Sequence, residues 1–132
     1  MSVARRTFAA ALAFGWIAAA QRPAAAAERA VFTDATFAAA QATGRKVVIE
    51  VTAPWCPTCR VQRPLIDATL AQPEFSDALL LSIDFDSMKA PQRQLNVRSQ
   101  STILVFRGAE ERGRATGITD PAAIAALLRR AL

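Results

Sequence analysis

The feature that most constrains the fold of this chain is the stretch APWCPTCR at residues 53–60, which holds its only two cysteines. This stretch overlaps the end of KVVIEVTA (46–53), whose β-branched and apolar residues are typical of a buried central strand. A helix is expected to begin at the cysteines and to run to about Leu70, with a bend at Pro64. A buried strand followed by a helix that starts with Cys-x-x-C is typical of an α/β domain.

The remaining patterns predict further strands and helices along the chain. They are a short strand at 30–32, a helix capped by Thr33 or Asp34 and ended by Gly44, a buried strand at 79–85, a short helix or turn at 89–96, and a hairpin of strands at 101–106 and 111–117 joined across Gly108. Strands that alternate with helices, followed by a hairpin, indicate helices packed on a mixed sheet.

A closing helix is predicted over DPAAIAALLRRAL (120–132). Asp120 is a suitable N-cap, Pro121 suits the first helical position, and Arg129 with Arg130 suits the negative end of the helix dipole. One face of this helix carries the apolar residues Ile124, Leu127, Leu128 and Leu132. We expect this face to pack against the sheet.

Residues 1–27 are typical of an export signal. MSVARRTF is a basic opening, a short alanine-rich apolar run follows, and AAAA before Glu28 offers a small-residue cleavage site. The apolar run is shorter than the roughly 20 residues that cross a bilayer. RRTF at 5–8 resembles the core of a twin-arginine signal, with a general secretion signal as the alternative. We expect cleavage near Ala27, a periplasmic location, and one folded domain over 28–132.

Composition excludes several classes of function. The 132 residues suffice for one modest core. The absence of histidine removes Ser–His and Cys–His catalysis and the commonest metal ligand. The net charge of +5 falls to +2 when the three arginines of the signal are removed, and the other arginines are scattered without interleaved aromatic residues. We therefore expect neither nucleic-acid binding nor stable membrane insertion.

The cysteine pair, Cys56 and Cys59, has three possible interpretations. A structural disulfide would close a loop too short to constrain the unfolded chain appreciably. A zinc site needs four ligands, and only carboxylates or a second chain could complete one here. The third interpretation is a redox pair that is oxidised and reduced in turn, which an exported, oxidising destination makes chemically reasonable.

The redox interpretation fits the position of the cysteines. At a helix N-terminus, unpaired N–H groups and the helix dipole favour the thiolate of Cys56, which is the attacking species. Cys59, one turn later, can attack a mixed disulfide and release the partner protein. Pro57 fixes the backbone between them, and Thr58 offers a hydroxyl. We expect one exposed sulfur that ionises readily and a second sulfur behind it.

The same region resembles the thioredoxin family. VVIEVTAPWCPTCRVQRPLID (47–67) resembles that family's strand–turn–helix, including Trp55 before the first cysteine and Pro64 where the helix kinks. STILVF (101–106), with Gly108 and Gly117, resembles its last two strands. The resemblance runs from about residue 31 to 132 and implies the thioredoxin fold, a central mixed β-sheet flanked by helices on both faces. Cys-Pro-Thr-Cys after a tryptophan also resembles proteins of cytochrome c maturation, and the rest resembles reductase domains that face the periplasm.

The resemblance implies roles for individual residues. Cys56 attacks, Cys59 resolves, and Glu50 matches the family's buried acid, which exchanges a proton with the second cysteine. Glutamate is one methylene longer than the family's usual aspartate, and the alternative is a strand acid that reaches solvent. The implied substrate groove is lined by Trp55, Pro57, Thr58, Gln100, Ser101, Thr102 and Gly117.

Ser101 departs from the family, which has a cis-proline at this position. A cis bond before a non-proline residue costs about 3–4 kcal/mol, so we expect a trans loop here. In the family, the backbone of the preceding residue, here Gln100, pairs with substrate, so affinity or selectivity is expected to differ. A serine would leave the cysteines less shielded, which would allow a metal or an iron–sulfur cluster between two chains. The alternative is that Ser101 is merely tolerated.

The sequence therefore predicts an exported, monomeric protein-disulfide reductase that acts on protein thiols and disulfides. It needs no cofactor and no metal, and its electrons come from a membrane-bound or soluble thiol partner. Two alternatives stay open, which are a metal-binding or metal-delivery protein that uses the same two sulfurs and a redox-silent interaction module on the same scaffold.

Overall fold

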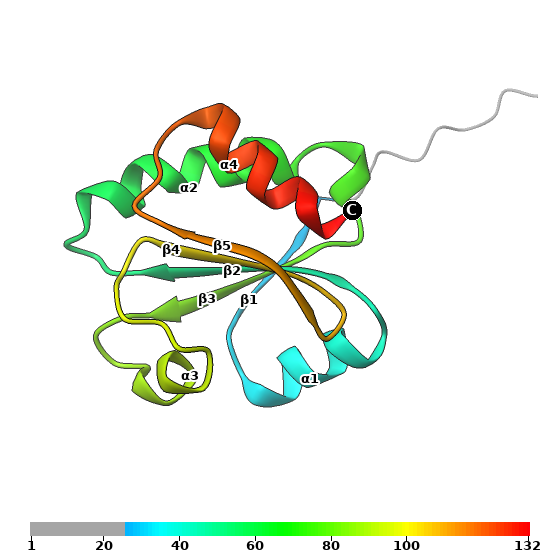
Figure 1. Ribbon diagram of the computed structural model, residues 1–132, viewed down its shortest axis with the longest axis horizontal. Coiled ribbons are helices and arrows are strands. Elements are labelled where there is room, and N and C mark those ends of the chain that lie inside the picture. The colour runs from blue at the N-terminus through cyan, green and yellow to red at the C-terminus, as the bar shows by residue number, and fades with distance from the viewer. Residues whose placement is uncertain (1–25) are drawn as a thin grey trace, which may run out of the picture.

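A five-stranded sheet forms the centre of the molecule in the computed structural model, which describes residues 26–132 (Figure 1). All but the last two residues of the predicted export signal lie outside this range. The elements in chain order are β1 Glu28–Val31, α1 Asp34–Ala42, β2 Lys46–Thr52, α2 Pro57–Leu70, β3 Leu79–Asp84, α3 Lys89–Gln94, β4 Thr102–Arg107, β5 Glu110–Thr116 and α4 Pro121–Leu128. Two short 3₁₀ turns, η1 Pro73–Phe75 and η2 Arg129–Ala131, complete the described chain.

The strand order is β1-β3-β2-β4-β5, which places β2 in the middle of the sheet. β1, β3 and β2 run parallel, while β4 is antiparallel to β2 and β5 is antiparallel to β4. In Figure 1, α2 and α4 cover one face of the sheet, and α1 and α3 lie on the other. This arrangement confirms the predicted mixed sheet with helices on both faces.

Alternation along β2 divides its side chains between two cores. Val47, Ile49 and Val51 join the core on the side of α1, and Val48 joins the core beneath α2 and α4. Because both faces are covered, the strand reads as an almost continuous apolar run. Glu50 has the same parity as Val48, so the strand carries a carboxylate beneath the helix that bears the cysteines.

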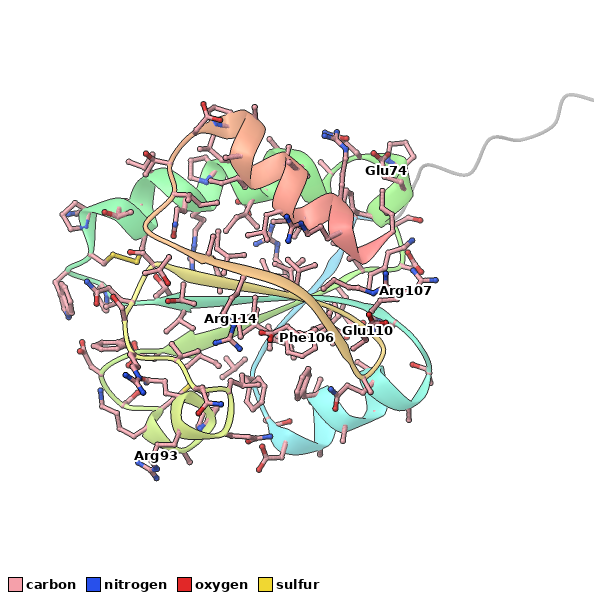
Figure 2. The ribbon with its side chains drawn as sticks, in the orientation of Figure 1. Glu74, Arg93, Phe106, Arg107, Glu110 and Arg114 are labelled. Carbon is pink, nitrogen blue, oxygen red and sulfur yellow. A yellow bond between two sulfur atoms is a disulfide. The ribbon has the colours of Figure 1, made fainter. Side chains whose placement is uncertain are left out.

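Aromatic side chains close the core on the side of α1. Phe37 from α1 lies with its ring centroid 5.3 Å from that of Phe32 and 5.1 Å from that of Phe106. Phe106 comes from β4 and meets Phe37 edge to face, a favoured geometry for aromatic pairs (Figure 2). These contacts fix α1 against one face of the sheet.

The predicted ends of α1 and the predicted start of α4 are confirmed. The hydroxyl of Thr33 accepts the N–H of Thr36 at 3.0 Å, and Gly44, at φ +67°, follows the last turn of α1. Asp120 caps α4 through the N–H of Ala123 at 2.8 Å, as expected.

Two predicted boundaries were wrong by more than one residue. The first strand spans Glu28–Val31 rather than 30–32, because its parallel pairing with β3 through the backbone includes two charged residues. The last three residues before Leu132 form a 3₁₀ turn, which has 3.0 residues per turn instead of 3.6. Leu132 is thereby carried off the apolar face and is 49% exposed. No helix within residues 26–132 has both the length and the apolar character that crossing a bilayer requires.

Candidate active site

Cys56 and Cys59 lie at the start of α2, directly after the central strand, and are joined by a disulfide (Figure 2). Cys56 is the N-cap residue, and its Sγ accepts the N–H of Cys59 at 3.1 Å. Pro57 occupies the first helical position, as expected from its fixed φ. A negative charge on the Cys56 sulfur would thus meet a backbone donor and the positive end of the helix dipole.

Both cysteines are buried in this oxidised form. Cys56 is 1% exposed and Cys59 is 6% exposed, and both pack with Ala53 and Phe85. The expectation of an exposed attacking sulfur in front of a shielded one is therefore wrong for this state. The physical reason lies in the loop that precedes β4, which covers both sulfurs.

Ser101, in that loop, contacts both sulfurs. Its Oγ lies 3.1 Å from the Sγ of Cys56 and 3.3 Å from the Sγ of Cys59, and the residue is 4% exposed. The expectation that a serine would leave the cysteines less shielded is wrong, because its side chain packs onto them. The expected trans loop is confirmed, since residues 26–132 contain no cis peptide bond.

The backbone of Ser101 is held in an uncommon conformation by three hydrogen bonds. Its φ is +61°, in the left-handed region that non-glycine residues seldom adopt. Its N–H donates to the Val51 carbonyl at 2.8 Å, while its carbonyl accepts from the Gly117 N–H at 3.0 Å and from the Gln62 side chain at 3.1 Å. The donors and acceptors come from β2, the end of β5 and α2, so the position of the Ser101 side chain is fixed from three directions.

Gln62 is a site residue that the sequence analysis missed. Its amide also donates to the Ile118 carbonyl at 2.9 Å, so it joins α2 to both loops beside the cysteines. The residue is buried although it is polar. A signal was available, because position 62 lies three residues after Cys59 and therefore on the same side of the helix.

The other predicted groove residues differ in what they offer a substrate. Trp55 is 53% exposed, and its Nε1 donates to Asp86 Oδ2 at 2.8 Å, so it is not packed into the core, and its groove role stays a prediction. Thr102 is buried, and its hydroxyl bonds the Ser99 carbonyl and the Thr116 hydroxyl. These bonds leave its side chain no surface for a substrate, which corrects its predicted lining role. Of the remaining four, Pro57 and Gly117 are exposed, and Thr58 and Gln100 are partly buried.

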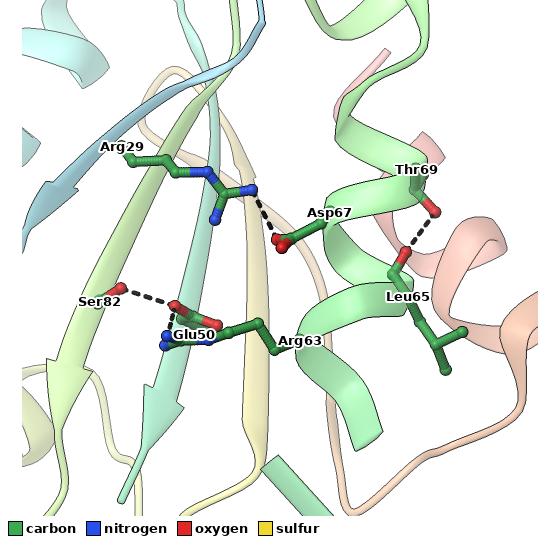
Figure 3. A network of polar contacts seen from close by, with 7 residues as sticks. All are labelled: Arg29, Glu50, Arg63, Leu65, Asp67, Thr69 and Ser82. Atoms are coloured by element: carbon green, nitrogen blue, oxygen red, sulfur yellow. Dashed lines mark hydrogen bonds and ion pairs between the residues drawn. The ribbon is translucent and has the colours of Figure 1, made fainter. Parts of the chain in front are cut away.

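Glu50 is buried on the α2 side of the sheet. It is 7% exposed, and its Oε1 accepts hydrogen bonds from Ser82 Oγ at 2.7 Å and from Arg63 Nη2 at 2.9 Å (Figure 3). The alternative of a strand acid that reaches solvent is therefore wrong. A buried carboxylate needs such partners, because an unpaired charge away from water is costly.

Two ion pairs connect α2 to the sheet in Figure 3. Arg63 on α2 reaches Glu50 on β2, and Arg29 on β1 reaches Asp67 on α2 at 2.6 Å. Within residues 26–132, no hydrogen bond joins Glu50 to Cys59, whose Sγ lies 4.0 Å from the Val51 carbonyl. Proton exchange between Glu50 and Cys59 stays a prediction.

An open pocket of about 430 Å³ lies beside Cys59. Its walls also include Arg60, Arg63 and Asp84. The hydrogen bond from the Ser87 side chain holds the pKa of Asp84 below its ordinary value, so this carboxylate is charged at neutral pH. The pocket thus brings Cys59 and the partner of the buried acid to one open space.

The described residues do not gather a complete set of metal ligands. Over residues 26–132, no group of three or more His, Cys, Asp or Glu side chains is placed to hold one ion. The metal-binding alternative would therefore require ligands from a second chain or from elsewhere.

Comparisons with known proteins identify relatives of the whole domain. A family model described as Thioredoxin matches residues 28–130, a range that contains every strand and α-helix of the described residues and both cysteines. The chain is 30% identical to a thioredoxin of Chlamydia trachomatis over 100 residues, which are 76% of this chain and 95% of that protein. It is 33% identical to thioredoxin-2 of Saccharomyces cerevisiae over 89 residues, 67% of this chain and 83% of that protein. A solved structure, Trxlp from Edwardsiella tarda, is similar with a TM-score of 0.74 and 36% identity, covering 76% of this chain and 98% of that one.

Proposed function

Because the chain belongs to the thioredoxin family and is a thiol–disulfide oxidoreductase, we propose that it acts as an exported, monomeric reductase of protein disulfides in the cell envelope. The observation that carries the chemistry is the pair of sulfurs at the N-terminus of α2, where the Cys56 sulfur already accepts a backbone N–H. Its substrates are protein thiols and disulfides, as the family implies. Cytochrome c maturation and general envelope redox homeostasis are the two processes proposed for it.

The reaction proceeds in two exchanges. The Cys56 thiolate attacks one sulfur of a substrate disulfide, forming a mixed disulfide and expelling the other substrate sulfur as a thiolate that takes a proton from water. Cys59 then loses its proton and attacks the Cys56 sulfur, forming the Cys56–Cys59 disulfide and releasing the second substrate thiol. Two electrons pass to the substrate, and a partner dithiol returns them by the reverse exchange.

The direction of electron flow is tested by the reduction potential of the pair. A reductase is expected to equilibrate nearer to the roughly −270 mV of thioredoxin than to the roughly −120 mV of strong periplasmic oxidants. The measurement is the fraction of Cys56–Cys59 disulfide across a series of dithiothreitol or glutathione ratios. A midpoint near the oxidant value would reverse the proposed direction.

Export is tested on the full-length chain in a bacterial host. The wild type is expected in the periplasmic fraction as a shortened protein that begins near Glu28. A variant with both Arg5→Lys and Arg6→Lys is expected to remain in the cytoplasm if the twin-arginine route is used. Unchanged export of that variant would favour general secretion, and a wild type that stays cytoplasmic would overturn the proposed location.

Glu50 is the proposed acceptor for the Cys59 proton. The carboxylate has no direct bond to Cys59, but its partner Arg63 lines the same pocket as that residue. A water in this open pocket, whose walls include the charged Arg63 and Asp84, would connect the two sites. Glu50 would then act as a general base for the second exchange.

Glu50→Gln is expected to slow the second exchange by about a hundredfold, the lower range for loss of a general base. The measurement is the release of substrate thiol from a preformed mixed disulfide, followed in a single turnover. Ser82→Ala is the matched control, because it removes one hydrogen bond from the same carboxylate and leaves the base in place. Equal rates for Glu50→Gln and the control would assign Glu50 a structural role.

A further inference from the structure

We propose that Ser101 is a catalytic residue whose hydroxyl donates a hydrogen bond to the Cys56 thiolate in the reduced protein. The proposal rests on the proposed function and deepens it, because it gives a chemical role to the position at which this chain departs from its family. It replaces the lining role that the sequence predicted for Ser101.

The contact with the sulfurs is the first observation behind this proposal. Ser101 Oγ lies 3.1 Å from one sulfur and 3.3 Å from the other. Within the part of the chain that the structure describes, no other side-chain oxygen or nitrogen forms a hydrogen bond with either sulfur. The only further donor to the Cys56 sulfur there is the N–H of Cys59, at 3.1 Å. A charge on Cys56 would therefore face two donors, one from α2 and one from the loop.

The available donors and acceptors determine which sulfur receives the hydroxyl proton of Ser101. A serine hydroxyl has one hydrogen to donate and two lone pairs to accept with. After reduction, the Cys56 thiolate is the charged acceptor and Cys59 is a weak S–H donor. The consistent arrangement is Cys59 S–H to Ser101 Oγ, and Ser101 O–H to the Cys56 sulfur. Each proton is donated once, and the bond to the thiolate is charge-assisted.

The hydrogen bond changes strength with the redox state. A disulfide sulfur is neutral and accepts weakly, whereas a thiolate is charged and accepts strongly. The Ser101 hydroxyl therefore stabilises the reduced form more than the oxidised form. Removing it is expected to raise the pKa of the Cys56 thiol and to favour the disulfide.

The hydroxyl is held in place before the reaction begins. Ser101 keeps a left-handed φ of +61° because bonds from Val51, Gly117 and Gln62 hold its backbone. A residue kept in such a conformation by its surroundings is typical of sites where a group must be positioned. A fixed donor in a site without bulk water needs no reorganisation when the charge forms.

Charged groups around the pair stay the same when only Ser101 is changed. None of them, in the described chain, forms a hydrogen bond with a sulfur. On the elements that surround the two cysteines they include Glu50 on β2, Arg60, Arg63 and Asp67 on α2, Asp84 and Asp86 at and after the end of β3, Lys89 on α3 over the ring of Phe85, and Arg98 in the loop before β4.

The test compares Ser101→Ala with Ser101→Gly. Both variants lack the hydroxyl, but glycine also accepts the left-handed φ without strain. Both are expected to raise the pKa of Cys56 by roughly one unit, measured from the ultraviolet absorbance of the thiolate against pH. Both are also expected to shift the equilibrium with glutathione about tenfold towards the Cys56–Cys59 disulfide, which corresponds to about 30 mV lower potential. Urea unfolding confirms that each variant is folded.

Each outcome decides between a hydroxyl effect and its rivals. Equal shifts in both variants support the proposal. An unchanged thiol pKa in both variants, or a shift in only one, would overturn it, because packing or backbone strain would then explain Ser101. The titration needs no substrate, so it is independent of the proposed function. A wild type that fails to reduce insulin disulfides would refute that function while leaving the Ser101 titration to be judged by itself.

Discussion

Cys56→Ser is expected to abolish disulfide reduction, with a fall in rate of more than about a thousandfold. A serine hydroxyl neither ionises near neutral pH nor forms a disulfide, so both the attack and the stored oxidation are lost. Insulin-disulfide reduction with dithiothreitol as the electron source measures the effect. A redox-silent interaction module would instead show no reductase activity in the wild type.

Cys59→Ser is the matched control, because it preserves the attack and removes only the resolving sulfur. This variant is expected to accumulate a mixed disulfide with its substrate, visible as a covalent adduct on a non-reducing gel. The structure makes the comparison informative, since Cys59 lines the open pocket whereas Cys56 is 1% exposed. Adducts formed by Cys56→Ser but not by Cys59→Ser would show that the two sulfurs have exchanged roles.

Local sequence patterns predicted the fold well where one residue controls one feature. Thr33 and Asp120 act through their own side chains on a backbone N–H three residues away, and Gly44 acts through its own backbone, so their effects on helix ends were readable. The start of β1 was misplaced, because its pairing with β3 involves backbone groups that side-chain composition does not report. Leu132 was misplaced because a change from α to 3₁₀ geometry occurs just before it.

In the candidate site, too, local features were predictable from the sequence and long-range contacts were not. The two cysteines were placed correctly, since a spacing of three within one helix turn brings them together in any such helix. The burial of Glu50 stayed open, because its partners come from residues 13 and 32 positions away. The Ser101 contact was not predicted, since it depends on a left-handed backbone and on hydrogen bonds to residues between 16 and 50 positions away.

Ser101→Pro, which introduces the family's residue, is expected to lower the free energy of unfolding by roughly 2–4 kcal/mol. Proline fixes φ near −65°, whereas Ser101 lies at +61°. The substitution also removes the N–H that donates to the buried Val51 carbonyl at 2.8 Å, and an unsatisfied buried group costs about 1–3 kcal/mol. Urea unfolding of the reduced proteins, followed by circular dichroism, measures the change.

Ser101→Gly is the control that separates the backbone from the hydroxyl. Glycine keeps the N–H and adopts the left-handed φ freely, so this variant is expected to remain within about 1 kcal/mol of the wild type. Equal destabilisation of the proline and glycine variants would assign the loss to the hydroxyl instead. A proline variant as stable as the wild type would mean that the loop can rebuild, and that the three hydrogen bonds to Ser101 do not fix it. A large loss of unfolding free energy with proline and a small one with glycine would show that the backbone of the loop, with its left-handed φ and its N–H, excludes proline at position 101.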